Sequence, residues 1–120
     1  MCKVLVLSNL ALTKRKVEEA VESGTNLLFA ENAREAWDKI VQNNGVDFAV
    51  IDDEMPNEEG MELLKYMRSN GLETPIVMFG DRAESERVLR CFELGADDYV
   101  EYGISTELLR AKIHVIMRRS

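Results

Sequence analysis

The sequence is poor in the residues from which most metal and nucleophilic sites are built. It contains one histidine, His114, and two cysteines, Cys2 and Cys91, which form no CxxC motif. A zinc site or a Ser-His-Asp triad therefore lacks the necessary parts. Two isolated cysteines are typical of a protein kept in a reducing compartment.

Positive charge and long apolar runs are also scarce. Lys and Arg number 15 against 22 Asp and Glu, so the net charge is −7. A chain of this charge repels a phosphate backbone, and we expect no direct binding of nucleic acid by this segment. No apolar run has membrane-spanning length and no secretion leader opens the chain, so we expect a cytoplasmic protein without a membrane partner.

Short apolar runs alternate with amphipathic segments along the 120 residues, a length that suits one domain. Strands are predicted at 3–7, 26–30, 48–51, 75–79 and 99–100. Helices are predicted, from apolar residues at helical spacing, at 13–23, 33–41, 60–69, 85–94 and 105–119. Five strands that alternate with five helices require parallel strands with helices on both faces. The sequence therefore predicts a three-layer α/β sandwich.

In such a sheet, ligands bind beyond the carboxyl ends of the strands. The residues at these ends are Ser8-Asn9, Asp52-Asp53-Glu54, Gly80-Asp81 and Glu101-Tyr102. One of these ends, in the stretch VIDDEMP, carries three consecutive carboxylates. Either a cation or a phosphoryl group binds there, or the acids are solvated and have no function.

Two motifs at these positions resemble the receiver domain of bacterial response regulators. They are D-x-x-M-P-x-x-x-G, which begins at Asp52, and GADDY at 95–99. The resemblance covers essentially residues 1–120. It implies a flavodoxin-like fold, with a five-stranded parallel sheet of strand order 2-1-3-4-5, and a regulatory rather than enzymatic role in a two-component phosphorelay.

The last helix extends the resemblance to one subfamily. The segment LRAKIHVIMRR at 109–119 is similar to the last receiver helix of the winged-helix (OmpR/PhoB-like) response regulators. This implies transcription regulation through a C-terminal DNA-binding domain that is absent from this chain and follows the linker entry at 117–120. It also implies a histidine kinase as a possible partner.

Receivers work through five side chains. Two consecutive acids end the first strand and hold magnesium together with the phosphoaccepting aspartate. A Thr or Ser ends the fourth strand, and a Lys, usually followed by Pro, ends the fifth. A carboxylate is a poor nucleophile towards a phosphoryl group, so metal and lysine must neutralise the charge that develops.

Of these five side chains, this sequence retains only Asp52, the phosphoacceptor equivalent. Ser8-Asn9 replaces the acidic pair, Gly80 replaces Thr or Ser, and Tyr102-Gly103 replaces Lys-Pro. The missing lysine alone removes a charge-assisted contact worth about 1.5–3 kcal/mol. We therefore expect no catalytic residue, no metal and no cofactor at a degenerate pocket formed by Ser8, Asn9, Glu54, Gly80 and Tyr102. Magnesium held by Asp52, Glu54 and Asn9 remains an alternative.

The resemblance also assigns expectations to three neighbouring side chains. Tyr99 matches the switch aromatic of receivers, and it is either held permanently inward or an ordinary half-buried tyrosine. Tyr102 is expected to cap the space of the missing lysine, before a trans turn at Gly103. Asp53 should point away from Asp52, because successive side chains of a strand alternate.

The last predicted helix is apolar on two sides, of which the sheet can bury only one. In the winged-helix subfamily, the second side belongs to a dimer face built from the fourth helix, the fifth strand and the fifth helix. We expect a homodimer through this face, formed by Val88, Asp98, Leu108, Ala111, Lys112 and Val115. Asp98 and Lys112 match an intersubunit ion pair, while Val88 and Leu108 replace a charged pair. The alternative is that Val88 and Leu108 are scattered surface residues.

Three functions stay open at this level. The first is an atypical receiver that dimerises without phosphorylation. The second is a working receiver that is phosphorylated at Asp52. The third is a stand-alone module that binds a protein or an uncharged small ligand between Gly80, Tyr102 and Ser8.

Overall fold

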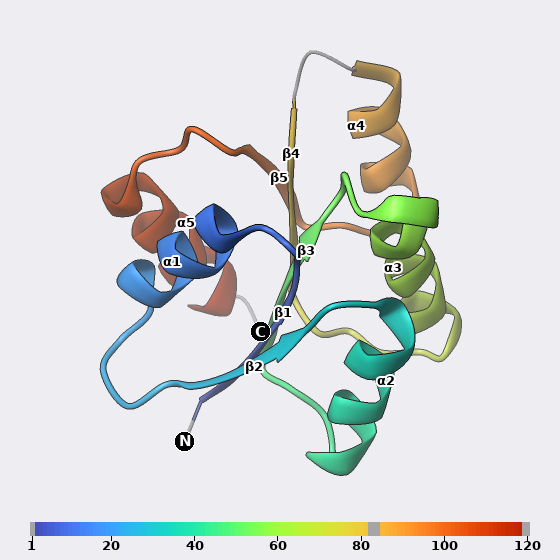
Figure 1. The fold of residues 1–120 in the computed structure, drawn as a ribbon, viewed down its shortest axis with the longest axis horizontal. Coiled ribbons are helices and arrows are strands. Elements are labelled where there is room, and N and C mark those ends of the chain that lie inside the picture. The colour runs from blue at the N-terminus through green and yellow to red at the C-terminus, as the bar shows by residue number, and fades with distance from the viewer. Residues whose placement is uncertain (1, 82–84, 119–120) are drawn as a thin grey trace.

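A five-stranded parallel sheet forms the centre of the domain, in the order β2-β1-β3-β4-β5 (Figure 1). The computed structural model describes residues 2–81 and 85–118. The strands are β1 (Lys3–Leu7), β2 (Asn26–Ala30), β3 (Phe48–Asp52), β4 (Ile76–Gly80) and β5 (Asp98–Glu101). The predicted flavodoxin-like fold and its strand order are confirmed.

Helices cover both faces of this sheet. They are α1 (Ala11–Ala20), α2 (Ala33–Gln42), α3 (Glu59–Ser69), α4 (Ser85–Glu93) and α5 (Thr106–Arg118), and the short 3-10 helix η1 (Pro56–Glu58) precedes α3. Figure 1 shows α1 and α5 on one face, and α2, α3 and α4 on the other. The chain therefore forms the three predicted layers.

Alternation along the strands divides the core into two clusters, one on each face of the sheet. Leu5, Ile51 and Met78 belong to the cluster that includes residues of α2, α3 and α4. Val50 and Leu109 belong to the cluster that includes residues of α1 and α5. Every residue of β3 and β4 is buried, because both faces of these central strands are covered.

The first helix differs most from its predicted bounds of 13–23. It begins at Ala11 and ends at Ala20, because Val21 has an extended backbone with φ −84° and ψ 158°. Gly24, with φ 90°, forms the turn that leads into β2 instead of ending the helix. The other described helix and strand ends lie within two residues of their predicted positions, and the expected end of the last helix at Arg119 lies outside the described residues.

The register of the sheet brings the polar strand ends together at one edge. Leu7 pairs with Ile51, Asp52 pairs with Phe79, and Gly80 pairs with Glu101. The residues that follow these positions therefore meet above the carboxyl ends of β1, β3, β4 and β5. Across residues 2–81 and 85–118, we find no helix with the length and apolar character needed to cross a membrane.

Candidate functional site

Asp52, the last residue of β3, lies at the centre of this edge and is only 2% exposed. Its Oδ2 accepts a hydrogen bond from the Ser8 hydroxyl at 3.0 Å. Its Oδ1 accepts one from the backbone N–H of Glu54 at 2.9 Å, and another from the Tyr102 hydroxyl. Both carboxylate oxygens are therefore engaged by donors of the chain itself.

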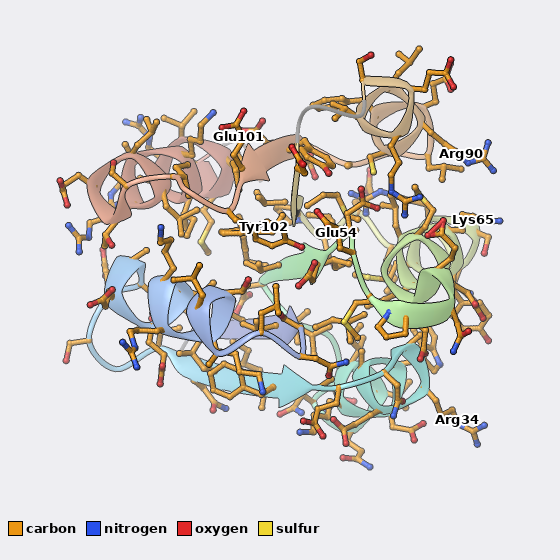
Figure 2. The ribbon with its side chains drawn as sticks, turned by 45° about the horizontal axis from the view of Figure 1, so that its top comes forward. Arg34, Glu54, Lys65, Arg90, Glu101 and Tyr102 are labelled. Carbon is orange, nitrogen blue, oxygen red and sulfur yellow. The ribbon has the colours of Figure 1, made fainter. Side chains whose placement is uncertain are left out.

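Tyr102 covers Asp52 at the position where a receiver lysine is expected. Burial, and then the hydrogen bond to Asp52, raise the pKa of Tyr102 well above its ordinary value. The phenol therefore stays protonated and donates a neutral hydrogen bond. Figure 2 shows Tyr102 and Glu54 at the same end of the sheet, and Glu54 also contributes to this pKa rise.

A lysine of α1 holds the segment that follows β5. Lys16 Nζ donates to the carbonyl oxygens of Tyr102 at 3.1 Å and of Ile104 at 2.6 Å. No cis peptide bond occurs in residues 2–81 and 85–118, so the turn at Gly103 is trans as predicted. Sequence reasoning missed Lys16, because nothing in a helical stripe shows which distant loop a surface lysine reaches.

Asp53 anchors a second polar cluster, on the other face of the sheet. Its side chain is 0% exposed, and it forms a bidentate pair with Arg87 of α4, with both N···O distances at 2.9 Å. The same guanidinium binds both carboxylate oxygens of Glu58, at 2.8 and 2.5 Å. Arg87 therefore ties α4 to the end of β3 and to η1. The prediction that Asp53 points away from Asp52 agrees with this geometry.

The backbone next to this contact has an unusual conformation. Asn57 and Glu58 both adopt the left-handed region, with φ 59° and 58°. Such a conformation costs a non-glycine residue about 1–2 kcal/mol. The hydrogen bond from Arg87 is the largest cause of a lowered pKa at Glu58, and it also raises the pKa of Arg87. Arg87 thus offsets strain where α3 begins.

Tyr99 completes the cluster from β5. It is 1% exposed, and its hydroxyl donates to Asp53 Oδ2 at 2.9 Å. Burial is the main cause that raises its pKa well above the ordinary value. Of the two expectations for Tyr99, the structure shows the inward position rather than a half-buried one. The space beside Gly80 is not open, because the Tyr99 phenol fills it.

Comparison with known proteins identifies the family and the fold of this chain. The sequence pattern described as "Response regulator receiver domain" matches residues 4–114. The chain belongs to this family.

Two curated relatives of this receiver are transcriptional regulators by name. The virulence transcriptional regulatory protein PhoP of Salmonella typhimurium is 31% identical over 121 residues, which cover 100% of this chain and 54% of that protein. The transcriptional regulatory protein PhoP of Escherichia coli K12 is 30% identical over 119 residues, 98% of this chain and 53% of that protein. The receiver thus spans about half the length of the curated relatives that it matches. This likeness supports the winged-helix resemblance.

Solved receiver structures are similar over their whole length. The receiver domain of the Francisella response regulator 1452 has a TM-score of 0.82 and 26% identity, and the match covers 99% of this chain and 98% of that one. A putative response regulator of Chloroflexus aurantiacus has a TM-score of 0.86 at 22% identity, with 98% of each chain covered, and shows the likeness of fold alone.

The residues of this receiver do not fit the magnesium ion that the family uses. Asn9 and Glu54 lie at the exposed rim, and Asp53 is committed to Arg87. Among the residues that the structure describes, no three His, Cys, Asp or Glu side chains are grouped to hold a metal. Magnesium prefers several hard oxygen ligands, and here it would have to displace two hydroxyl groups from Asp52. The alternative metal site of Asp52, Glu54 and Asn9 is therefore not supported.

The residues of the expected dimer face lie mostly on the surface. Leu108 and Val115 are 51% and 39% exposed, and Ala111 is exposed as well. Lys112 Nζ lies 3.0 Å from Asp98 Oδ2 within the same chain, although the resemblance implied a pair between subunits.

The fourth helix carries both half-buried and exposed apolar residues. Val88 is half-buried and packs against the core cluster, and its place in a dimer face stays a prediction. Leu89 and Phe92 on the same helix are 59% and 40% exposed. Their i, i+3 spacing places Leu89 and Phe92 on the same side of the helix, but this spacing alone does not show whether that side faces the sheet or solvent.

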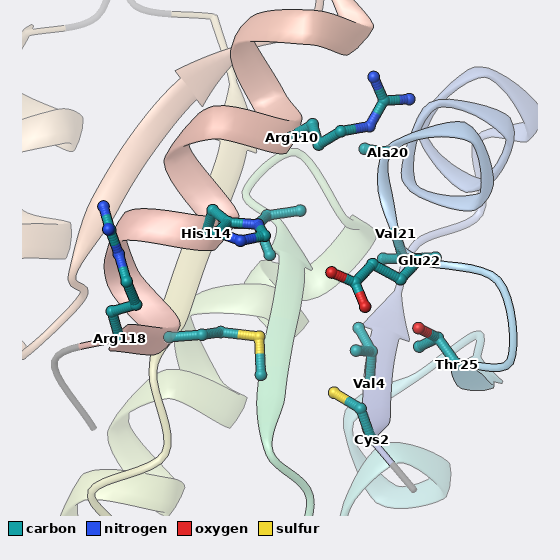
Figure 3. A pocket seen from close by; sticks show the side chains of 11 residues that line it. Cys2, Val4, Ala20, Val21, Glu22, Thr25, Arg110, His114 and Arg118 are labelled. Atoms are coloured by element: carbon teal, nitrogen blue, oxygen red, sulfur yellow. The ribbon is translucent and has the colours of Figure 1, made fainter.

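The two cysteines and the histidine have no part in the Asp52 site. Cys2 and His114 line a cavity of about 320 Å³ between α1 and α5, near the amino end of β1 (Figure 3). Burial is the largest cause that raises the pKa of the Cys2 thiol, and burial also raises the pKa of Cys91 to about 12. Both thiols are therefore protonated and poor nucleophiles at neutral pH.

Proposed function

We propose that this receiver domain regulates transcription without being phosphorylated. The observation that carries the proposal is the occupation of Asp52, whose two oxygens accept hydrogen bonds from Ser8, Tyr102 and a backbone amide. A phosphoryl group would need a metal and a cation in the places that these neutral donors take. Asp52 is then a structural residue that holds β1 and the end of β5 together.

The Asp53 cluster takes over the role that a phosphate has in other receivers. In the family, the switch aromatic moves inward when a Thr or Ser engages the phosphoryl group. Here Tyr99 is the switch aromatic, Gly80 offers no hydroxyl, and Tyr99 is held inward by Asp53. Arg87 fixes α4 to the same carboxylate. The surface of α4, β5 and α5 therefore has one arrangement, whether or not a phosphodonor is present.

That surface is the proposed homodimer face. Its exposed apolar residues are Leu89, Phe92, Leu108 and Val115. Scattered single apolar residues are ordinary on a protein surface, but four large ones favour a partner. They lie on α4 and α5, which cover opposite faces of the sheet, so the proposed face crosses the edge strand β5 (Figure 1). In the dimer, Asp98 and Lys112 exchange their pair within the chain for pairs between subunits.

The effector of this receiver is proposed from its relatives. The matching PhoP proteins are named transcriptional regulators, and this chain covers about half of their length. We infer that residues 1–120 are the regulatory domain of a longer transcription factor, whose DNA-binding domain follows Ser120. The net charge of −7 agrees with DNA binding through another domain.

A second candidate, the phosphoacceptor receiver served by a histidine kinase, is favoured by one observation. Asp52 stands at the end of β3, at the position of the family's phosphoacceptor. The third candidate, a small ligand between Gly80, Tyr102 and Ser8, is disfavoured because the phenols of Tyr99 and Tyr102 occupy the space and use the polar groups there.

Phosphorylation is tested with acetyl phosphate and magnesium, followed by intact-mass spectrometry. We expect no mass gain under conditions that phosphorylate a control receiver with all five side chains. A triple variant, Ser8→Asp, Asn9→Asp and Tyr102→Lys, restores the family's acidic pair and lysine. Phosphorylation of this variant would show that the missing side chains prevent phosphorylation of the native protein. A stoichiometric phosphoryl gain in the native protein, lost in Asp52→Asn, would show the second candidate to be correct.

The dimer face is tested by light scattering on the untreated protein over a range of concentrations. We expect a concentration-dependent dimer that Leu108→Glu or Phe92→Glu shifts towards the monomer. Leu12→Glu is the matched control, because Leu12 is a 55% exposed leucine on α1. A native protein that stays monomeric at the highest concentration contradicts a dimer of this domain alone.

A further inference from the structure

An aromatic groove lies between α2 and α3, outside every position discussed above. It has a volume of about 520 Å³, and its walls include Trp37 from α2 and Tyr66 from α3. The two rings meet edge to face, with centroids 4.6 Å apart and planes at 81°. We propose that this groove binds a basic segment of a partner protein, with a lysine or arginine side chain laid against the two aromatic rings.

Trp37 is half-buried and packs against the core, while its neighbours Tyr66 and Val41 are exposed. Tyr66 is 50% exposed, and Val41, one turn after Trp37 on α2, is 57% exposed. Trp and Tyr are the residues that most often dominate protein interfaces. Their ring faces also attract ammonium and guanidinium groups, by about 0.5–2 kcal/mol. The groove thus offers both an apolar surface and a site for a cation.

Charge around the groove favours a basic occupant. Three carboxylates line it, those of Asp38, Glu59 and Glu62, against one guanidinium, that of Arg34. Arg34 pairs with Asp38 at 3.7 Å, but these side chains are 88% and 53% exposed. Such an exposed pair is weak, so Asp38 can change partner at little cost. The domain as a whole, at −7, attracts a basic partner over longer distances.

The shape of the groove is set before a partner arrives. Glu59 Oε1 accepts the backbone N–H of Ala33 at 2.8 Å, which ties the start of α3 to the start of α2. Leu63 is buried beneath the groove and packs in the core, so α3 cannot rotate freely. A rigid site loses little entropy when it binds.

A peptide suits this site better than the other cationic or charged ligands. Nucleic acid and anionic membranes are repelled by the same carboxylates. A small cation alone would leave the neighbouring Val41 side chain uncovered. A peptide in which basic and apolar residues alternate can place a cation against the aromatic rings and an apolar side chain against Val41. The groove is lined by residues of α2 and α3, whereas the proposed dimer face uses residues of α4 and α5, so the two surfaces share no residue (Figure 1).

The test uses Trp37, which is the single tryptophan of the chain. The probe is the acetylated and amidated peptide Lys-Leu-Lys-Leu-Lys, and the control is the same peptide with Gln in place of Lys. We expect a saturable shift of the Trp37 indole N–H resonance with the basic peptide only. Tyr66→Leu should weaken binding by about fivefold, the size of one cation–π contact.

Charge variants separate the groove from general attraction to an acidic protein. Asp38→Asn with Glu62→Gln should weaken binding of the basic peptide several-fold. Glu18→Gln with Glu19→Gln changes the net charge equally on α1, at exposed positions on the other face of the sheet, and should leave the affinity within about twofold. Unfolding midpoints check that each variant is folded.

Four results would overturn the proposal. They are the absence of an indole shift, an equal response to the Gln peptide, and equal weakening by the two charge variants. The fourth is tetramethylammonium binding with the same affinity as the peptide, which would show a small-cation site in place of a docking site for a protein segment. None of these measurements depends on phosphorylation or on the dimer face.

Discussion

The Tyr99 hydroxyl occupies the place where any side chain at position 80 would begin. A Cβ built on Gly80 would lie 2.0 Å from Tyr99 Oη and 2.8 Å from Cζ. Real carbon and oxygen atoms do not approach so closely, so any larger residue at position 80 requires the Tyr99 ring to shift from the place that it occupies here. The observed inward position of Tyr99 therefore depends on the absence of a side chain at Gly80.

Gly80→Ala should therefore destabilise the domain by about 1–3 kcal/mol, the usual cost of overpacking a core. The measurement is urea unfolding followed by circular dichroism. In a Tyr99→Leu background, the same substitution should cost clearly less, because the clashing phenol is gone. Gly103→Ala is the matched control: a Cβ at Gly103 meets nothing within 4 Å, so stability should change by less than about 0.5 kcal/mol. Equal losses for the two glycines would contradict the packing described.

Arg87→Met should cost about 2–3 kcal/mol of unfolding free energy. It leaves the buried Asp53 carboxylate without its charged partner, and the loss of one partner of a buried pair costs about 3–5 kcal/mol. The partial exposure of Arg87, 25%, reduces the expected effect. Arg90→Met on the same helix is the control, because Arg90 is exposed, and it should change stability by less than about 0.5 kcal/mol. Adding Asp53→Asn to Arg87→Met should recover part of the loss, and failure to recover would argue against Asp53 as the cause.

Acid should weaken the contact between Glu58 and Arg87. The folded pKa of Glu58 is lowered below its ordinary value of 4.5, mainly by the hydrogen bond from Arg87. The stabilisation is therefore present above pH 4.5 and is lost as the pH falls through the lowered folded pKa. Urea midpoints measured from neutral to acid pH should fall less steeply in Glu58→Gln than in the native protein. Glu18→Gln is the control, and its urea midpoint should fall with pH as steeply as that of the native protein. If the midpoint of Glu58→Gln falls equally steeply, the contact between Glu58 and Arg87 does not stabilise the fold.

Alkali should act through the two buried phenols. The pKa values of Tyr99 and Tyr102 are raised above 10.0 in the folded state, first by burial and then by their aspartate partners. The stabilisation is present below pH 10 and is lost as the pH rises, because the unfolded chain releases these protons more readily. Phenolate absorbance from both residues should appear together with unfolding. Tyr102→Phe should remove one tyrosine from that step, and titration of both phenols near pH 10 in folded protein would refute the prediction.

The secondary structure and the loss of the receiver constellation were readable from the chain. Apolar runs such as KVLVL predict buried strands. The motif that contains Asp52 and Gly60 shows which positions correspond to the receiver's acids, hydroxyl and lysine, and these side chains are missing here. Only Asp52 of the five expected side chains is present, and this conclusion needs no coordinates. The first helix was placed less well, because Val21 leaves the helix before the glycine that usually marks its end.

The partners of the polar residues were not readable in the same way. In the sequence, nothing distinguishes Arg87 from the other polar residues of its helix. In the structure it binds the carboxylates of Asp53 and Glu58, which follow β3. Lys16 reaches a loop that is remote in sequence. Likewise, Leu89 and Phe92 of α4 are more exposed than Val88, because the orientation of the helix on the sheet decides how far each residue is buried.

Local pattern and motif spacing by themselves determined the α/β class, the place of the site at the carboxyl ends of the strands, and the absence of the family's charged partners. These properties follow from short-range periodicity and from residue identity. The tertiary structure alone decided which groups bind the two aspartates. Ser8 and Tyr102 bind Asp52, and Tyr99 and Arg87 bind Asp53. Their hydrogen bonds join residues from different strands and helices, and such contacts depend on packing distances that no local stretch of sequence encodes.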